Sequence, residues 1–185
     1  SWVINSDIEN NYIISSSREL GFQPLEQVNL WNEINHNKEY ENNKKDDFLI
    51  NEFQEVNKLN LIKVLNFIRS NQAPLIREIL DFQHRDIIKR IDERSGALIY
   101  KDEILFTLLK DINYQDEEIY TLTVGRCWDE RLKPFLKKVI NNFFKKSPLS
   151  MIKTYKENTE LNLYLEECNL RDKYHEIILV RNTII

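Results

Sequence analysis

Apolar residues recur with a helical period over two stretches of this chain, and each stretch ends in a run with the period of a β-strand. The first stretch begins near Leu59 and the second near Arg131. Each contains a proline at a position where it can begin a helix. This repeated order of three helices followed by a β-branched strand predicts two winged helix-turn-helix units.

In the first unit, residues 48–68 are predicted as one long or two short helices, and Pro74 begins the next helix. The third helix runs from His84 to Arg94, with Gly96 as its C-terminal cap. Residues 97–100 form the first wing strand. The return strand is either residues 104–108 or residues 119–124.

The second unit contains the clearest helix of the sequence. Apolar residues follow the i, i+3, i+4 rule from Leu132 to Phe144. Pro148 begins a second helix that reaches Tyr155, residues 160–168 form a third, and residues 176–185 supply one or two wing strands.

The first 47 residues are predicted as an arm packed on the first unit. Residues 2–4 and 12–14 have strand composition, a helix begins at Pro24 and covers residues 24–35, and residues 36–47 form a polar loop. The fold class is therefore α+β, mainly helical, with tandem winged helix-turn-helix units. Residues 1–112 hold the arm and the first unit, and residues 113–185 hold the second.

Composition excludes several classes of protein. Hydrophobic residues make up 42% of the chain and charged residues 30%, and no apolar run is long enough to cross a bilayer. The two cysteines form no CxxC pair and the three glycines stand apart, which argues against a zinc site and against a phosphate-binding loop. No histidine lies in a nucleophile motif. We therefore expect no enzyme activity, no catalytic residue, no cofactor and no metal.

Charge points to interaction surfaces instead. The chain carries a net charge of −4, yet residues 126–156 contain nine bases and two acids. The residues expected to contact a partner lie on the third helix of the first unit and on the long helix of the second: they are Arg85, Lys89, Arg90, Arg94, Lys137, Lys138, Lys145 and Lys146. Acids on both recognition helices weaken contact with phosphates, so a protein partner is favoured over nucleic acid.

The order of elements from Phe48 to Ile185 resembles the carboxy-terminal tandem winged-helix region of the STN subunit family of the telomeric CST complex, which is similar to the middle subunit of RPA. The resemblance implies a non-enzymatic interaction module of a nuclear protein at chromosome ends. Its implied partners are telomere-capping subunits and a subunit of polymerase α–primase, with weak or indirect contact to DNA and none to a membrane.

Two alternatives stay open on the residues alone. One is a sequence-specific winged-helix DNA-binding regulator that uses residues 84–94. The other is a bacterial toxin-system or immunity protein with an unrelated α+β fold. A cytoplasmic location is the alternative to the nucleus.

Overall fold

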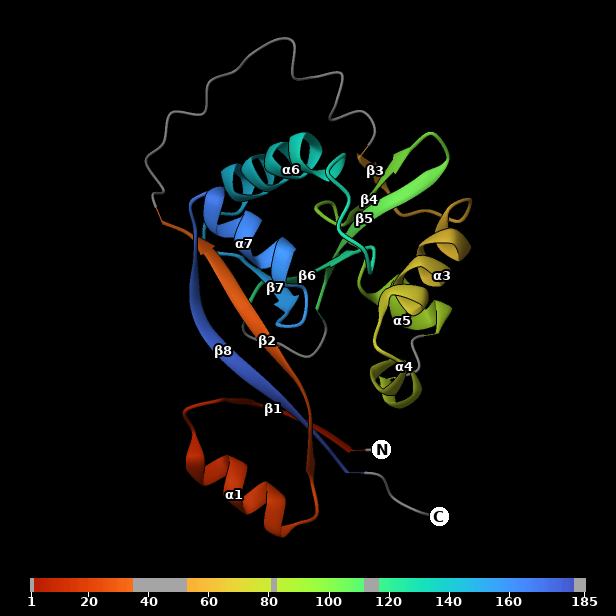
Figure 1. The fold of residues 1–185 in the computed structure, drawn as a ribbon. Helices are drawn as coiled ribbons and strands as arrows, with labels where there is room; N and C mark the ends of the chain where they lie inside the picture. The colour runs from red at the N-terminus through yellow and green to blue at the C-terminus, as the bar shows by residue number, and fades with distance from the viewer. Residues whose placement is uncertain (1, 35–52, 81–82, 112–116, 182–185) are drawn as a thin grey trace.

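The computed structural model describes residues 2–34, 53–80, 83–111 and 117–181, which form one eight-stranded sheet with helices on both faces (Figure 1). The strand order is β1-β8-β2-β7-β6-β5-β4-β3. The strands are β1 (Trp2–Asp7), β2 (Gln23–Glu33), β3 (Phe53–Glu55), β4 (Gly96–Tyr100), β5 (Glu103–Lys110), β6 (Ile119–Val124), β7 (Met151–Tyr155) and β8 (Leu170–Arg181). The helices are α1 (Asn11–Glu19), α3 (Leu61–Asn71), α4 (Pro74–Leu80), α5 (His84–Lys89), α6 (Leu132–Lys146) and α7 (Thr159–Glu167).

Six of the seven strand pairings within the described ranges are antiparallel, and β6 pairs with β7 in parallel. A parallel pair needs a crossover connection, and α6 supplies it. Strand β2 lies between β7 and β8, and β1 pairs with the other side of β8, so strands from the two ends of the sequence lie side by side at one edge of the sheet.

The sheet has a core on each face. Neighbouring residues of a strand point to opposite faces, and Leu108 and Leu109 of β5 belong to different clusters. Leu108 packs in the larger cluster with α6 and α7, while Leu109 packs with α3 and α5. Helices cover both faces, which leaves the middle strands buried on both sides.

Burial on both faces explains two wrong predictions. Residues 24–35 and the stretch after Pro148 were expected to be helical, yet they form β2 and β7. All five residues of β7 are buried, including Lys153 and Thr154, and residues 28–31 of β2 are buried as well. A strand buried on both faces shows no alternation, so a short apolar run does not distinguish it from a helix.

Several local predictions are confirmed. The helix predicted from Leu132 is α6, the helix at Pro74 is α4, and residues 159–167 form α7. Strands β4 and β5 form the predicted hairpin, turning through Lys101 (φ 49°) and Asp102 (φ 66°), the two positive values that a tight two-residue turn requires. Both proposed return strands exist, as β5 and β6.

Other local predictions are wrong. Residues 12–14 lie in α1, whose Asn10 side chain accepts a hydrogen bond from Ile13 N–H, and not in a strand. The helix predicted over residues 84–94 ends at Lys89, and Gly96 begins β4 where a helix cap was expected. The predicted loop over 36–47 and the start of the helix at residue 48 lie outside the described residues.

The winged-helix prediction is wrong as a whole, because a single mixed sheet runs through both proposed units. The boundary placed between residues 112 and 113 falls outside the described ranges, and the strands on either side of it, β5 and β6, are antiparallel neighbours. The fold class is an α/β sheet with helices on both faces, in place of a mainly helical pair of small units.

Candidate functional site

The parallel strands β6 and β7 run together for only three residue pairs. Their register joins Ile119 to Met151 and ends with Thr121 opposite Lys153. Beyond that point β6 continues beside β5 to Val124, while β7 pairs with β2 up to Tyr155. The carboxyl ends of the two strands therefore diverge. In α/β sheets a ligand binds in such a crevice, outside the carboxyl ends of the strands.

The face of this crevice under α3 and α4 carries a row of polar side chains. Thr107, Thr121 and Thr123 lie on it from β5 and β6, and Lys153 and Tyr155 lie on it from β7. All five are buried. Two buried oxygen atoms near this face have no hydrogen-bond partner within the described residues. They are Thr107 Oγ1 and Gln72 Oε1, the latter at the end of α3. Buried polar atoms are nearly always paired, so unpaired acceptors at a crevice mark a place where a ligand donor fits.

A carboxyl and a phenol lie on the same face of the sheet at the open end of the row. Glu26 of β2 lies opposite Ile178, and Tyr155 of β7 lies opposite Val28, on the face where Val28, Tyr155 and Ile178 pack with Ile76 of α4. Burial raises the pKa of Glu26, and the nearby Glu157 raises it further, against a hydrogen bond from the Gln27 N–H. Burial raises the pKa of Tyr155 to about 12; the charge of Arg90 lowers it, and the charges of Asp111 and, to a smaller extent, Glu26 raise it.

A carboxyl that holds its proton more tightly than usual beside a neutral phenol is an acid–base pair suited to proton transfer. The Gln72 side chain lies near this pair and lowers the pKa of Tyr155. Arg126, just after β6, fixes the end of α3 over the crevice: its backbone N–H donates to Asn71 Oδ1 at 3.0 Å, and its guanidinium donates to the Gln72 carbonyl at 3.0 Å.

A buried ionic cluster supports the point where the strands diverge. Asp111 follows β5 and contacts Lys153 of β7 and, at 3.6 Å, Arg90. The Thr121 hydroxyl donates to Asp111 Oδ2 at 3.1 Å and accepts from Arg90 at 3.2 Å. The three charged side chains are at most 6% exposed. The cluster joins β5, β6 and β7 to the segment after α5.

The N-terminus of α6 stands at the same end of β6. Its cap residue, Arg131, donates its backbone N–H to Asp129 Oδ1 at 2.9 Å. The next two N–H groups, of Leu132 and Lys133, donate to the carbonyls of Asp129 and Glu130 at 2.9 and 3.3 Å. The residue after these is Pro134, which has no N–H. The donors that helices usually offer to an anion are thus used within the chain.

The structure separates the residues that the sequence singled out for partner contact. Arg85 and Lys89 are exposed on α5, while Lys137, Lys145 and Lys146 are exposed on α6, which covers the other face of the sheet. Lys138 is half-buried. Arg90 is buried and forms part of the ionic cluster, with its Nε donating to the Lys110 carbonyl at 2.8 Å. These residues form no common surface.

Arg94 has a structural role at the opposite end of β6. Its guanidinium makes a two-pronged contact with Glu118, at 2.6 and 2.8 Å, and donates to Ser147 Oγ at 2.8 Å. Hydrogen bonds from Arg94 lower the pKa of Glu118. Asp92 accepts the Tyr120 hydroxyl at 2.5 Å and the Ser95 hydroxyl at 2.9 Å. The contacts tie the start of β6 to the end of α6.

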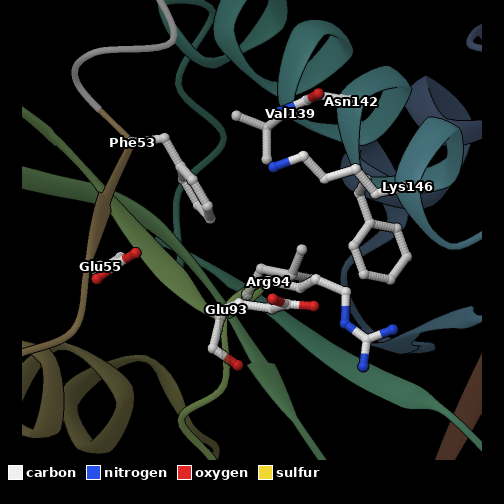
Figure 2. Close-up of a pocket in the computed structure, with 10 residues that line it drawn as sticks. Phe53, Glu55, Glu93, Arg94, Val139, Asn142 and Lys146 are labelled. Atoms are coloured by element: carbon white, nitrogen blue, oxygen red, sulfur yellow. The ribbon is translucent and has the colours of Figure 1, made fainter.

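Arg94 and Lys146 also line a pocket of about 180 Å³ between α6, β3 and the loop before β4. Phe53, Leu108, Val139 and Phe143 give it an apolar lining, with Glu55, Glu93, Ser95 and Asn142 as its polar residues. Figure 2 shows Phe53 and Lys146 extending into it from opposite sides, while the Arg94 guanidinium points away. The pocket lies on the face of the sheet that α6 covers, opposite to the face of the crevice.

Neither a metal centre nor a membrane-spanning helix is found among the described residues. No group of His, Cys, Asp or Glu side chains in the described ranges is placed to hold a metal ion. No helix in the part of the chain that the structure describes is long and apolar enough to cross a membrane.

The whole arrangement is similar to solved structures that include the following three. A GCN5-related N-acetyltransferase (GNAT) from Sphaerobacter thermophilus matches with a TM-score of 0.52 and 10% identity, over 96% of this chain and 58% of that one. A GNAT-family acetyltransferase from Colwellia psychrerythraea matches with a TM-score of 0.52 and 13% identity, over 96% and 63%. A functionally unknown conserved protein from Staphylococcus epidermidis matches with a TM-score of 0.55 and 12% identity, over 100% and 74%. The chain has the GNAT fold.

At the level of sequence, no family model and no curated protein matches this chain. The chain spans less than two thirds of the length of the first two GNAT structures. The likeness overturns the resemblance to the STN subunit, and with it the expected winged-helix, telomere-capping module and the winged-helix DNA regulator. It also contradicts the prediction that the chain is not an enzyme, since two of the three structures are acetyltransferases.

Sequence reasoning missed the residues of the crevice altogether. Glu26 fell in a helix predicted for the N-terminal arm and Tyr155 in a helix predicted for the second unit, so nothing local indicated that they share a face. The one available signal was the pair Lys153 and Thr154 inside an otherwise apolar run, because a buried lysine requires a partner.

Proposed function

We propose that this chain transfers an acyl group from a thioester to an amine, in the crevice between β6 and β7 on the face covered by α3 and α4. The observation that carries the proposal is the divergence of these parallel strands beside Glu26 and Tyr155. The GNAT fold shared with two acetyltransferase structures supports it.

Acyl transfer to an amine requires one proton to be removed and another to be supplied. The amine nitrogen attacks the thioester carbonyl and loses a proton as the carbon–nitrogen bond forms. Glu26 is the group we assign to this step, because a raised pKa makes a carboxylate a stronger base. The buried Oε1 of Gln72 accepts a hydrogen bond from the same amine and orients it.

The carbon–sulfur bond then breaks and the thiolate leaves. Tyr155 supplies its proton, since a phenol with a pKa of about 12 is fully protonated at neutral pH. Solvent returns a proton to Tyr155 and takes one from Glu26, which restores both groups and balances the reaction.

Backbone groups hold the donor. Alternate residues of a strand direct N–H and C=O groups to opposite edges, and beyond Thr121 the edge of β6 that faces β7 has no paired strand within the described residues. Such an edge binds the amide groups of an extended arm and stabilises negative charge on the carbonyl oxygen.

Coenzyme A thioesters carry a diphosphate in addition to the extended pantetheine arm that bears the thioester. The beginning of α6 does not fit a diphosphate, because its first N–H groups are already bonded within the chain and two carboxylates, of Asp129 and Glu130, lie beside it. No step of the reaction proposed here depends on that group.

Release of free thiol from acyl thioesters in the presence of amines tests the proposal. We expect release above the blank for at least one donor and amine, and a fall in kcat of about 10² to 10⁴ for Tyr155→Phe. Tyr174→Phe is the matched control, because Tyr174 is also a hydrogen-bonded phenol with a raised pKa but contacts Glu117, away from the crevice. Full activity of Tyr155→Phe, or no release with any pair, would contradict the proposal.

A further inference from the structure

The N-terminus of α6 holds an anion that belongs to the chain itself. A helix that follows a parallel strand directs its N–H groups and positive dipole end toward the crevice, where a phosphate of the ligand usually binds. Here the Asp129 carboxylate occupies that end and accepts the backbone N–H of Arg131 at 2.9 Å. What this carboxylate means for recognition of the acyl donor rests on the proposed acyl-transfer function.

Asp129 also engages the cationic side chain at this position. The Arg131 Nε donates to Asp129 Oδ1 at 3.0 Å and to Oδ2 at 2.8 Å, and its terminal nitrogen donates to Oδ2 at 2.6 Å. The same nitrogen contacts Glu103 of β5 at 3.3 Å. Arg131 therefore presents its guanidinium fork to two carboxylates of the chain, in the geometry in which it would otherwise bind a phosphate.

The two other cations near the helix start are engaged as well. Lys133 Nζ lies 2.8 Å from Glu130 Oε2, and Glu130 Oε1 accepts the indole N–H of Trp128 at 2.8 Å. The Arg126 guanidinium donates to the Gln72 carbonyl.

The loop between β6 and α6 also lacks the glycines that let the backbone of a phosphate-binding loop approach the phosphate closely. Its only glycine, Gly125, has no positive φ angle, and a Cβ there would meet nothing closer than the Cys127 carbonyl oxygen at 3.6 Å. Glycine is needed in a phosphate loop where the backbone bends sharply or touches the ligand.

We propose that this chain recognises its acyl donor through the thioester arm alone, and that Asp129 takes the place of the donor's diphosphate at α6. The donor class is a thioester of a pantetheine-like thiol, and any nucleotide attached to it stays in solvent. Asp129 is then a residue that sets donor specificity.

Two donors that share the arm and differ in the nucleotide test this directly. We expect kcat/KM for acetyl-coenzyme A and for S-acetylpantetheine to agree within about threefold, with no inhibition by inorganic pyrophosphate up to about 10 mM. A preference of about thirtyfold or more for acetyl-coenzyme A would overturn the inference while leaving the acyl-transfer function intact.

Calorimetry with inorganic pyrophosphate separates the two proposals if neither donor reacts. If no acyl transfer is seen, the proposed function is wrong. The titration with pyrophosphate then tests by itself whether Asp129 excludes a diphosphate from α6. No saturable heat up to about 10 mM supports it, and saturable binding that Arg131→Ala abolishes overturns it.

Removing the negative charge of Asp129 should create a binding site for pyrophosphate at the start of α6. Asp129→Asn keeps the side-chain shape and removes the charge, so pyrophosphate affinity should rise about tenfold or more above that of the wild type. Glu130→Gln is the matched control, because it alters the neighbouring carboxylate without freeing Arg131, and it should show no gain. If folded Asp129→Asn binds pyrophosphate no better than the wild type, Asp129 is not the group that excludes the diphosphate and the inference is wrong.

Discussion

Replacing Asp111 is the most direct test of whether the buried ionic cluster stabilises the strands that form the crevice. It is 1% exposed and contacts Lys153, Arg90 and the Thr121 hydroxyl, so one carboxylate serves three elements. Asp111→Asn removes the charge, while its backbone N–H still donates to the Ile119 carbonyl at 2.7 Å. The substitution therefore changes the ionic contacts and leaves the strand pairing in place.

The expected loss is large because the contacts are buried. Removing one partner of a buried ion pair costs about 3–5 kcal/mol of unfolding free energy. For a chain of this size, each kcal/mol corresponds to roughly 2–4 °C in Tm, so Asp111→Asn should melt about 6–20 °C lower.

Urea denaturation followed by circular dichroism measures the effect. Glu103→Gln is the control, because its pair with Arg131 is more than half exposed on both sides and should leave the midpoint unchanged. Combining Asp111→Asn with Lys153→Met should cost less than the sum of the two single changes, as expected for residues in contact. An Asp111→Asn variant within about 1 kcal/mol of the wild type would refute this role of the cluster.

Three further predictions concern the core, the response to acid and the pH dependence of the reaction. Phe143 is 4% exposed and packs edge-on against Tyr120, so Phe143→Ala should cost about 3–5 kcal/mol in denaturant unfolding. Burial alone would raise the pKa of Asp92, but hydrogen bonds, first of all that from the Tyr120 hydroxyl, lower the pKa overall. The Asp92 carboxylate therefore stabilises the fold above the ordinary aspartate pKa, and this stabilisation is lost in acid. The wild type should be more stable than Asp92→Asn at neutral pH, and the difference should vanish as the pH falls below about 4. If Glu26 is the base, the rate should rise with pH through a pKa above the ordinary glutamate value, and Glu26→Gln should remove that rise from the pH–rate profile.

Local sequence signals predicted the elements whose fold depends on nearby residues. The stripe of α6 is unbroken, and Pro74 begins α4 as its fixed backbone angle favours. The hairpin of β4 and β5 was also predictable, because its two strands are close in sequence and joined by two residues.

The architecture was not predictable in this way, because its decisive pairings are long-range. Strand β2 lies between β7 and β8, and no local pattern indicates that residues 23–33 pair with residues near the other end of the chain. The repeat that suggested winged helices arose from a helix, a proline and a β-branched run occurring twice, an order that an α/β sheet also produces.

The candidate site was hidden for the same reason. Glu26 and Tyr155 come to lie on one face only when β2 and β7 are neighbours, and their pKa values depend on burial that the sequence does not show. Charge clusters, which the sequence does show, indicated Arg90 and Arg94 instead, and both hold the fold together.

Nuclear magnetic resonance on the isotopically labelled chain tests the central claim most directly, by locating where an acyl thioester binds. On titration with S-acetylpantetheine, we expect the backbone amide signals of residues 122–124 and 155 to shift together and saturate, while Tyr155→Phe leaves the binding but slows thiol release. Shifts confined to the pocket of Phe53 and Lys146, or none anywhere, would contradict a site of acyl transfer between β6 and β7.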